Sequence, residues 1–88
     1  MQVRAIWKTA CRVGAEREAI EQTYTDRLIA LCGGPTQAWN YHQWHYQAGQ
    51  PRASQWARFN AVALDEATRQ LLPSERRLAA FQVVFVHD

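Results

Sequence analysis

Both ends of this chain have the sequence pattern of β-strands, whereas the residues between them have the pattern of helices. Between residues 2 and 13, Val3, Ala5 and Trp7 fall on one side of the period-two pattern and all the charged residues on the other. That pattern is typical of a strand with one buried face. The C-terminal run FQVVFV is rich in the β-branched and aromatic side chains that favour strands. We therefore expect residues 2–12 and 81–86 to be strands of one sheet.

Helices are predicted between these strands. Ile20, Tyr24 and Leu28 recur at the spacing of one helical face, which predicts an amphipathic helix. Gly33 suits the left-handed position after its end, and Pro35 suits the first position of the next helix. We place three helices near residues 15–31, 35–48 and 54–71.

The predicted fold is one α+β domain over residues 1–88, mostly helical, with the order β-α-α-α-β. The terminal strands are expected to pair antiparallel, and the helices have to pack on them because two strands alone are marginally stable. The alternative is a small all-α bundle in which residues 2–31 form one or two helices.

The composition is that of a small globular domain, with 48% hydrophobic and 20% charged residues. Its net charge of +2 is too small to indicate a nucleic-acid-binding protein. We see no signal peptide, and no apolar run approaches the ~20 residues that span a bilayer. We therefore expect a cytoplasmic protein outside the membrane, whose two cysteines, Cys11 and Cys32, are free and dispensable for activity. A disulfide between them is the alternative.

Residues 35–59 hold six of the ten Trp, Tyr and Phe residues (four, three and three in the whole chain). No acidic residue occurs between Asp26 and Asp65. Trp, Tyr and Arg supply much of the binding energy at protein interfaces, where acidic residues are depleted. We assign Trp56 and Phe59 to the core because they lie on the apolar stripe of the third helix. The predicted partner-binding residues are Tyr41, His42, Trp44, His45, Arg52 and Arg58.

The sequence contains few residues arranged for catalysis or metal binding. His42 and His45 are three residues apart on a predicted helix and can reach one metal ion, but zinc sites take three or four protein ligands. The remaining histidine is His87, and both cysteines are remote in sequence. We therefore expect no metal, no cofactor and no enzymatic activity, with metal binding by the two histidines as the open alternative.

These observations predict a small binding protein, an inhibitor or adaptor that docks its aromatic, acid-free surface on a protein or nucleoprotein. It is similar in size, single domain and lack of catalytic motifs to inhibitors encoded by phages and mobile elements, including anti-CRISPR proteins. The alternative is a single-stranded nucleic-acid-binding protein that stacks bases on the same aromatic and Arg side chains. A homodimer that buries this surface is a further alternative.

Overall fold

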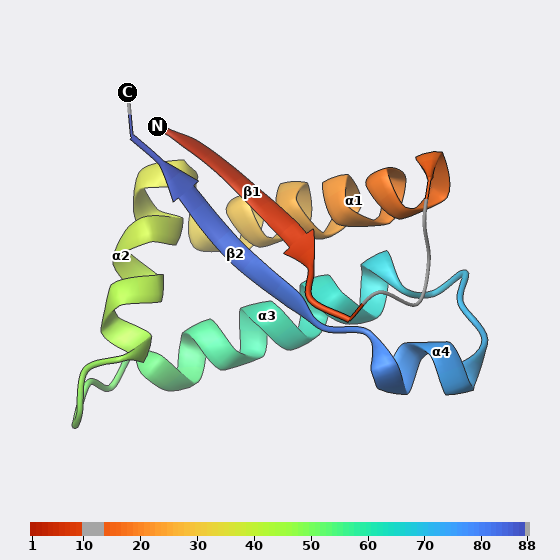
Figure 1. Ribbon diagram of the computed structural model, residues 1–88. Helices are drawn as coiled ribbons and strands as arrows, with labels where there is room; N and C mark the ends of the chain where they lie inside the picture. Colours follow the sequence, from red (N-terminus) through yellow and green to blue (C-terminus); the bar gives the residue numbers. More distant parts are fainter. Residues whose placement is uncertain (10–13, 88) are drawn as a thin grey trace.

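The computed structural model describes residues 1–9 and 14–87 (Figure 1). Strands at the two ends of the chain enclose a helical segment, as predicted. The elements are β1 (Gln2–Trp7), α1 (Ala15–Cys32), α2 (Pro35–His45), α3 (Ala53–Ala67), α4 (Pro73–Leu78) and β2 (Phe81–Val86). None of these helices is both long enough and apolar enough to cross a membrane.

The two strands pair antiparallel, with Val3 opposite Phe85 and Ala5 opposite Val83. Along β1 every second residue is buried, which confirms the predicted period of two. The α+β prediction with paired terminal strands is therefore confirmed, and the all-α alternative is wrong.

The predicted N-terminal strand is too long. The main chain of Lys8 still donates a hydrogen bond to Ala80 O (2.6 Å), but Lys8 and Thr9 lie in a bend. Beyond Ala80 the partner chain turns into α4, so β1 has no strand left to pair with. Residues 10–12 of the predicted strand lie outside the described residues.

Helices α1 and α3 form a layer on one face of the sheet, α2 stands at the end where the two chain termini lie, and α4 lies beyond the opposite end (Figure 1). Helix α1 packs against both β1 and α3, and α2 packs against α1 and α3. Ala38 of α2 and Ala63 of α3 are fully buried, and such small side chains allow close approach between helices. The core centres on the fully buried Ile20, Tyr24 and Leu28 of α1, which confirms the predicted apolar face.

Helix ends follow local hydrogen bonding. Gly33 takes the left-handed conformation (φ 94°) and donates to Ile29 O and Ala30 O, as its position in the sequence predicts. Helix α2 ends at His45 rather than at residue 48, because the Tyr46 N–H turns back to Gln43 O in a tighter bond.

The third helix is shorter than the predicted 54–71, and α4 follows it as a separate helix beyond residue 71. Helix α3 ends at Ala67, and the Thr68 hydroxyl bonds to Leu64 O at 2.7 Å. The Arg76 Nε then donates to Thr68 O at 2.9 Å, so a side chain from α4 satisfies a carbonyl after the helix end. Helix α4 itself begins with Pro73 at a position that needs no N–H.

Side chains of α1 close the outer edge of β1. The Ala5 N–H donates to Thr25 Oγ1, and the Trp7 N–H donates to Glu21 Oε1, both at 3.0 Å. Arg17 donates to Trp7 O at 2.8 Å and pairs with Glu21 at 3.0 Å. Charged residues of an amphipathic helix usually face solvent, but Arg17 and Glu21 here contact a strand. They supply hydrogen bonds that a neighbouring strand would otherwise provide.

Replacing Thr25 by Val should leave the buried Ala5 N–H without its acceptor. An unsatisfied buried donor costs about 1–3 kcal/mol, so the free energy of unfolding should fall by that amount in a urea titration. Thr23→Val is the matched control, because Thr23 makes the same bond to the preceding turn but is exposed. Equal midpoints for the two variants would show that the Thr25 hydroxyl does not hold β1 on α1.

Candidate functional site

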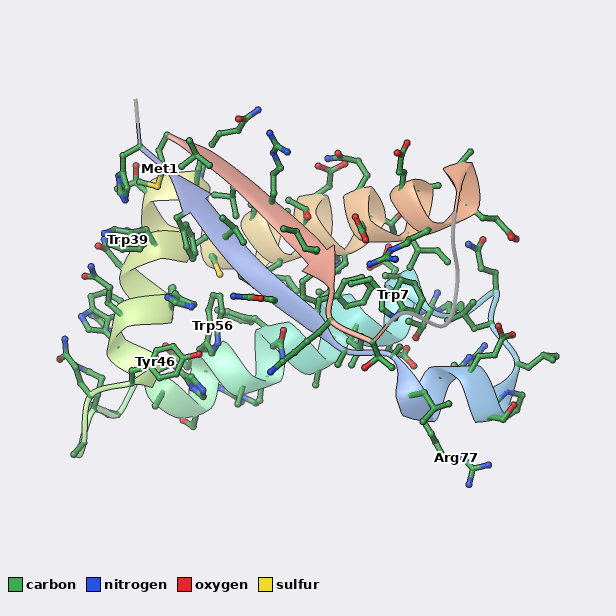
Figure 2. The ribbon with its side chains drawn as sticks, in the orientation of Figure 1. Met1, Trp7, Trp39, Tyr46, Trp56 and Arg77 are labelled. Atoms are coloured by element: carbon green, nitrogen blue, oxygen red, sulfur yellow. The ribbon has the colours of Figure 1, made fainter. Side chains whose placement is uncertain are left out.

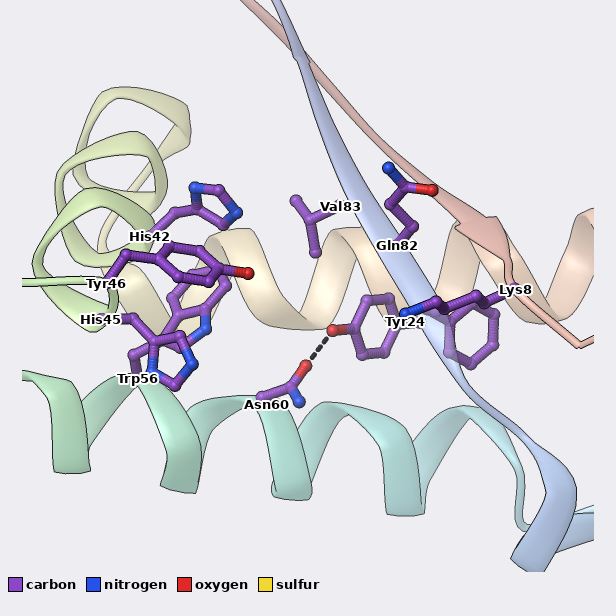
Figure 3. A pocket seen from close by; sticks show the side chains of 10 residues that line it. Lys8, Tyr24, His42, His45, Tyr46, Trp56, Asn60, Gln82 and Val83 are labelled. Atoms are coloured by element: carbon purple, nitrogen blue, oxygen red, sulfur yellow. Dashed lines mark hydrogen bonds between the residues drawn. The ribbon is translucent and has the colours of Figure 1, made fainter.

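A cleft of about 460 Å³ opens between α2, α3 and β2 (Figure 3). Helix α2 supplies one wall, α3 and Tyr24 of α1 supply the floor, and β2 supplies the opposite wall. Lys8 reaches it from the segment after β1. The lining residues are Lys8, Tyr24, His42, His45, Tyr46, Trp56, Asn60, Phe81, Gln82 and Val83.

Aromatic rings form the α2 side of the cleft. The His42 ring centroid lies 5.5 Å from that of Trp56, 5.0 Å from that of Tyr46 and 4.9 Å from that of Phe85. His45 contacts Tyr46 at 5.0 Å in a T-shaped arrangement. The rings hold one another in edge contacts, which aromatic pairs favour.

The exposed fraction of each side chain divides these rings into buried rings that pack in the core and rings that face solvent. Trp56 is 5% exposed, so its predicted place in the core is confirmed, whereas Tyr46 is 74% exposed. Figure 2 shows Trp39, Tyr46 and Trp56 gathered at the α2 end of the molecule, and Trp7 toward the other end of the sheet. Tyr46 therefore presents an aromatic surface at the mouth of a cleft whose wall is rigidly packed.

Tyr24 and Asn60 make the polar floor. The Tyr24 hydroxyl donates to Asn60 Oδ1, and the Tyr24 ring stacks on Phe81 with centroids 4.5 Å apart. Burial, with a smaller contribution from the nearby Cys32 thiol, raises the pKa of Tyr24 above its ordinary value. Tyr24 therefore stays a neutral hydrogen-bond donor at neutral pH.

No Asp or Glu is among the residues described as lining the cleft. This agrees with the acid-free interval of the sequence, although Lys8, Tyr24 and Gln82 come from outside it. Burial lowers the pKa of His42, and the neighbouring His45 lowers it further, so His42 is neutral at pH 7. Lys8 then supplies the formal positive charge at the cleft.

The structure separates the six predicted partner residues. His42 and His45 line the cleft. Tyr41 and Trp44 instead belong to an outer cluster, in which Tyr41 contacts Trp44 at 5.3 Å and Phe59 at 5.4 Å. The Arg52 guanidinium lies 4.4 Å from the centre of the Trp44 ring, a cation–π contact.

The outer cluster is partly structural. Phe59 and Tyr41 are half-buried and pack against the core, which supports the core assignment of Phe59 and gives Tyr41 a packing role that we had not predicted. Trp44 is half-buried under Arg52, and Arg58 is exposed on α3.

Sequence reasoning missed Lys8, Tyr24, Asn60 and Gln82 as cleft residues. They come from four different parts of the chain, and only the packing of the paired terminal strands and of α1 and α3 brings them together. Tyr46 could have been predicted as a cleft residue, because it belongs to the aromatic stretch and lies close in sequence to the predicted His42 and His45.

Cys32 is a buried, free thiol, and burial raises its pKa to about 11. It is therefore protonated at pH 7 and a poor nucleophile. Cys11, and with it half of the free-thiol prediction, lies outside the described residues. In the described part of the chain, no three His, Cys, Asp or Glu side chains come close enough to hold one metal ion.

In comparisons with known proteins, no protein-family model matches this chain, and no curated protein or solved structure matches it significantly.

Truncating a buried and an exposed cleft aromatic should change stability by very different amounts. Trp56→Ala removes a buried ring and should lower the free energy of unfolding by about 3–5 kcal/mol. Tyr46→Ala removes a ring that is 74% exposed and should change it by about 0.5 kcal/mol or less. Thermal melts followed by circular dichroism measure both. If Tyr46→Ala melts far below the parent protein, Tyr46 is a structural residue rather than an exposed surface.

The lowered pKa of His42 makes stability depend on pH. The ordinary pKa of histidine is 6.5, so below this pH His42 is protonated in the unfolded chain. In the folded protein His42 stays neutral until the pH approaches its lowered pKa. The free energy of unfolding should therefore fall as the pH falls from 6.5 toward the lower pKa of the folded state. His42→Gln should flatten this dependence between about pH 7 and pH 5, as measured by urea titration.

His45→Gln is the control for that experiment. Burial is the larger cause of the His42 shift and His45 the smaller, so this variant should keep most of the pH dependence. The variants are compared by the slope of the free energy of unfolding against pH. The absolute free energy is unsuitable, because His42→Gln also loses ring contacts. An unchanged slope in His42→Gln would assign the pH dependence to other groups.

Proposed function

We propose that this protein is a non-enzymatic binding protein of the cytoplasm, an inhibitor or adaptor that docks the cleft and its exposed rim on a protein or nucleoprotein. The observation that carries the proposal is Tyr46, which is 74% exposed at the mouth of a cleft lined by other rings and by no described carboxylate. Exposed aromatic side chains beside a preformed cleft are the usual anchors of protein interfaces.

Preorganisation supports this proposal. His42 is held by Tyr46, Trp56 and Phe85, so the wall of the cleft needs little ordering when a partner binds. Rigid interface groups lose less conformational entropy on association, which favours affinity. Tyr46 itself has few rotatable bonds for its large contact area.

The chemistry of the buried groups favours binding over catalysis. Cys32 has a pKa of about 11 and Tyr24 a raised pKa, so neither ionises readily at neutral pH to act as a nucleophile or base. We therefore keep the comparison with small phage and mobile-element inhibitors, among them anti-CRISPR proteins, as the functional class proposed.

Single-stranded nucleic acid is the alternative ligand, because the exposed Tyr46 ring is able to stack on a base. A protein partner is favoured over it. Lys8 is the sole Lys or Arg among the residues described as lining the cleft, whereas nucleic-acid grooves combine stacking rings with several cations. In the outer cluster, Arg52 already covers one face of Trp44.

Affinity capture from a host lysate, with and without nuclease, tests the proposal. The parent protein should retain a protein partner after nuclease treatment, and Tyr46→Ala should lose it because the interface anchor is gone. Leu72→Ala is the matched control, since Leu72 is 65% exposed but lies before α4, away from the cleft. This variant should capture the same partner as the parent.

Two results would contradict the proposal. If Tyr46→Ala captures the partner as well as Leu72→Ala does, the cleft rim is not the binding surface. If capture disappears with nuclease, and binding to an arbitrary single-stranded DNA falls steeply between ~50 and ~200 mM salt, the ligand is nucleic acid.

A further inference from the structure

Strand β2 has an edge that faces the cleft rather than another strand. In an antiparallel pair, residues whose N–H and C=O point toward the partner strand alternate with residues whose groups point away. Lys8 donates to Ala80 O, so position 80 points toward β1, and so do positions 82 and 84. The N–H and C=O groups of Phe81 and Val83 therefore point away from β1.

The hydrogen bonds on the β1 edge of the sheet confirm this assignment of inward- and outward-pointing residues. By the same alternation, the N–H groups of Ala5 and Trp7 must point away from β2, and these are the groups that bond to Thr25 and Glu21 of α1. On the β1 edge, side chains of α1 thus satisfy the outward N–H groups of Ala5 and Trp7 and the C=O of Trp7. Within residues 1–9 and 14–87, the outward N–H and C=O groups of Phe81 and Val83 have no hydrogen-bond partner.

Phe81 and Val83 also line the cleft (Figure 3). One end of the molecule therefore combines an open strand edge, a wall of packed rings and a lysine. We propose that the cleft binds an extended peptide segment of a partner protein, which adds to β2 as a third strand and places an acidic side chain near Lys8. This inference rests on the proposed function and specifies the part of the partner that enters the cleft.

The geometry selects an extended chain as the occupant. Alternate residues of a strand repeat every ~6.8 Å, so main-chain groups of one peptide can meet those of Phe81 and Val83 together. A cleft of about 460 Å³ is in the range of sites that enclose small ligands, so it accepts a few residues of such a peptide rather than a domain.

Charge selects an acidic segment. Lys8 and two histidines line the cleft, and no described lining residue is a carboxylate. An Asp or Glu of the guest strand therefore meets an ammonium group and no competing acid. A basic side chain in the same place would meet like charge.

The test uses the whole protein labelled with ¹⁵N and the capped peptide acetyl-Thr-Val-Asp-Val-Thr-amide at about 1 mM, where weak main-chain pairing is measurable. In the free protein, the Phe81 and Val83 amides should exchange with solvent faster than the Gln82 and Val84 amides, which face β1. The peptide should shift the Phe81 and Val83 resonances and slow their exchange. Because main-chain bonds supply most of the affinity, the peptide residues other than Asp are secondary.

Four matched probes identify the interaction. The peptide methylated on every amide nitrogen should lose binding, whereas one methylated on alternate nitrogens keeps one free edge and should bind. Replacing Asp by Lys in the peptide, or Lys8 by Gln in the protein, should weaken binding by about tenfold, the loss expected for a charge-assisted contact.

Three outcomes overturn the inference: no change at Phe81 and Val83, equal binding of the fully methylated peptide, or protection that appears with protein concentration alone. The last would mean that a second copy of this chain occupies the edge. The proposed function fails separately, since it depends on partner capture by the parent and its loss in Tyr46→Ala. If the parent protein captures a partner but the peptide has no effect on Phe81 and Val83, the proposed binding function stands and the added-strand inference is wrong.

Discussion

The arrangement of this molecule depends on the hydrogen bonds that α1 makes to the outer edge of β1. A two-stranded sheet is marginally stable, and both of its edges expose main-chain groups. Thr25 and Glu21 satisfy the amides of Ala5 and Trp7, so β1 is fixed to α1 by polar bonds as well as by the apolar face of the sheet. With α1 covering the β1 edge at Ala5 and Trp7, the other edge of the sheet is that of β2, and it borders the cleft between α2 and α3.

This constraint explains why the aromatic residues of α2 serve two purposes. The helix stands beside the open edge, so its His42 side packs on Phe85 of β2, while Tyr41 packs on Phe59 of α3. One helix thereby connects the sheet to the third helix through rings on both of its sides. The aromatic stretch is neither wholly core nor wholly surface, because α2 has a neighbour on each side and a cleft at one of them.

The sequence predicted the elements better than the site. Periodicity reports which residues share a face, so the buried side chains of β1 and the Ile20, Tyr24 and Leu28 face of α1 followed from it directly. It could not report that Arg17 and Glu21, polar residues on a helix, bond to a strand edge. That requires the distance between two elements, which no local pattern contains. The same limit hid Lys8 and Asn60 from the predicted site.

The cleft keeps its structural and its exposed residues apart, and this has a consequence for how binding can change. Trp56 and Tyr24 are buried and hold the wall and the floor, so most substitutions there reduce stability. Tyr46 and His45 are exposed on the rim, where substitutions cost little stability. The main-chain groups of Phe81 and Val83 are independent of any side chain. A partner can therefore be held by contacts common to every extended peptide, while rim residues set which peptide is preferred.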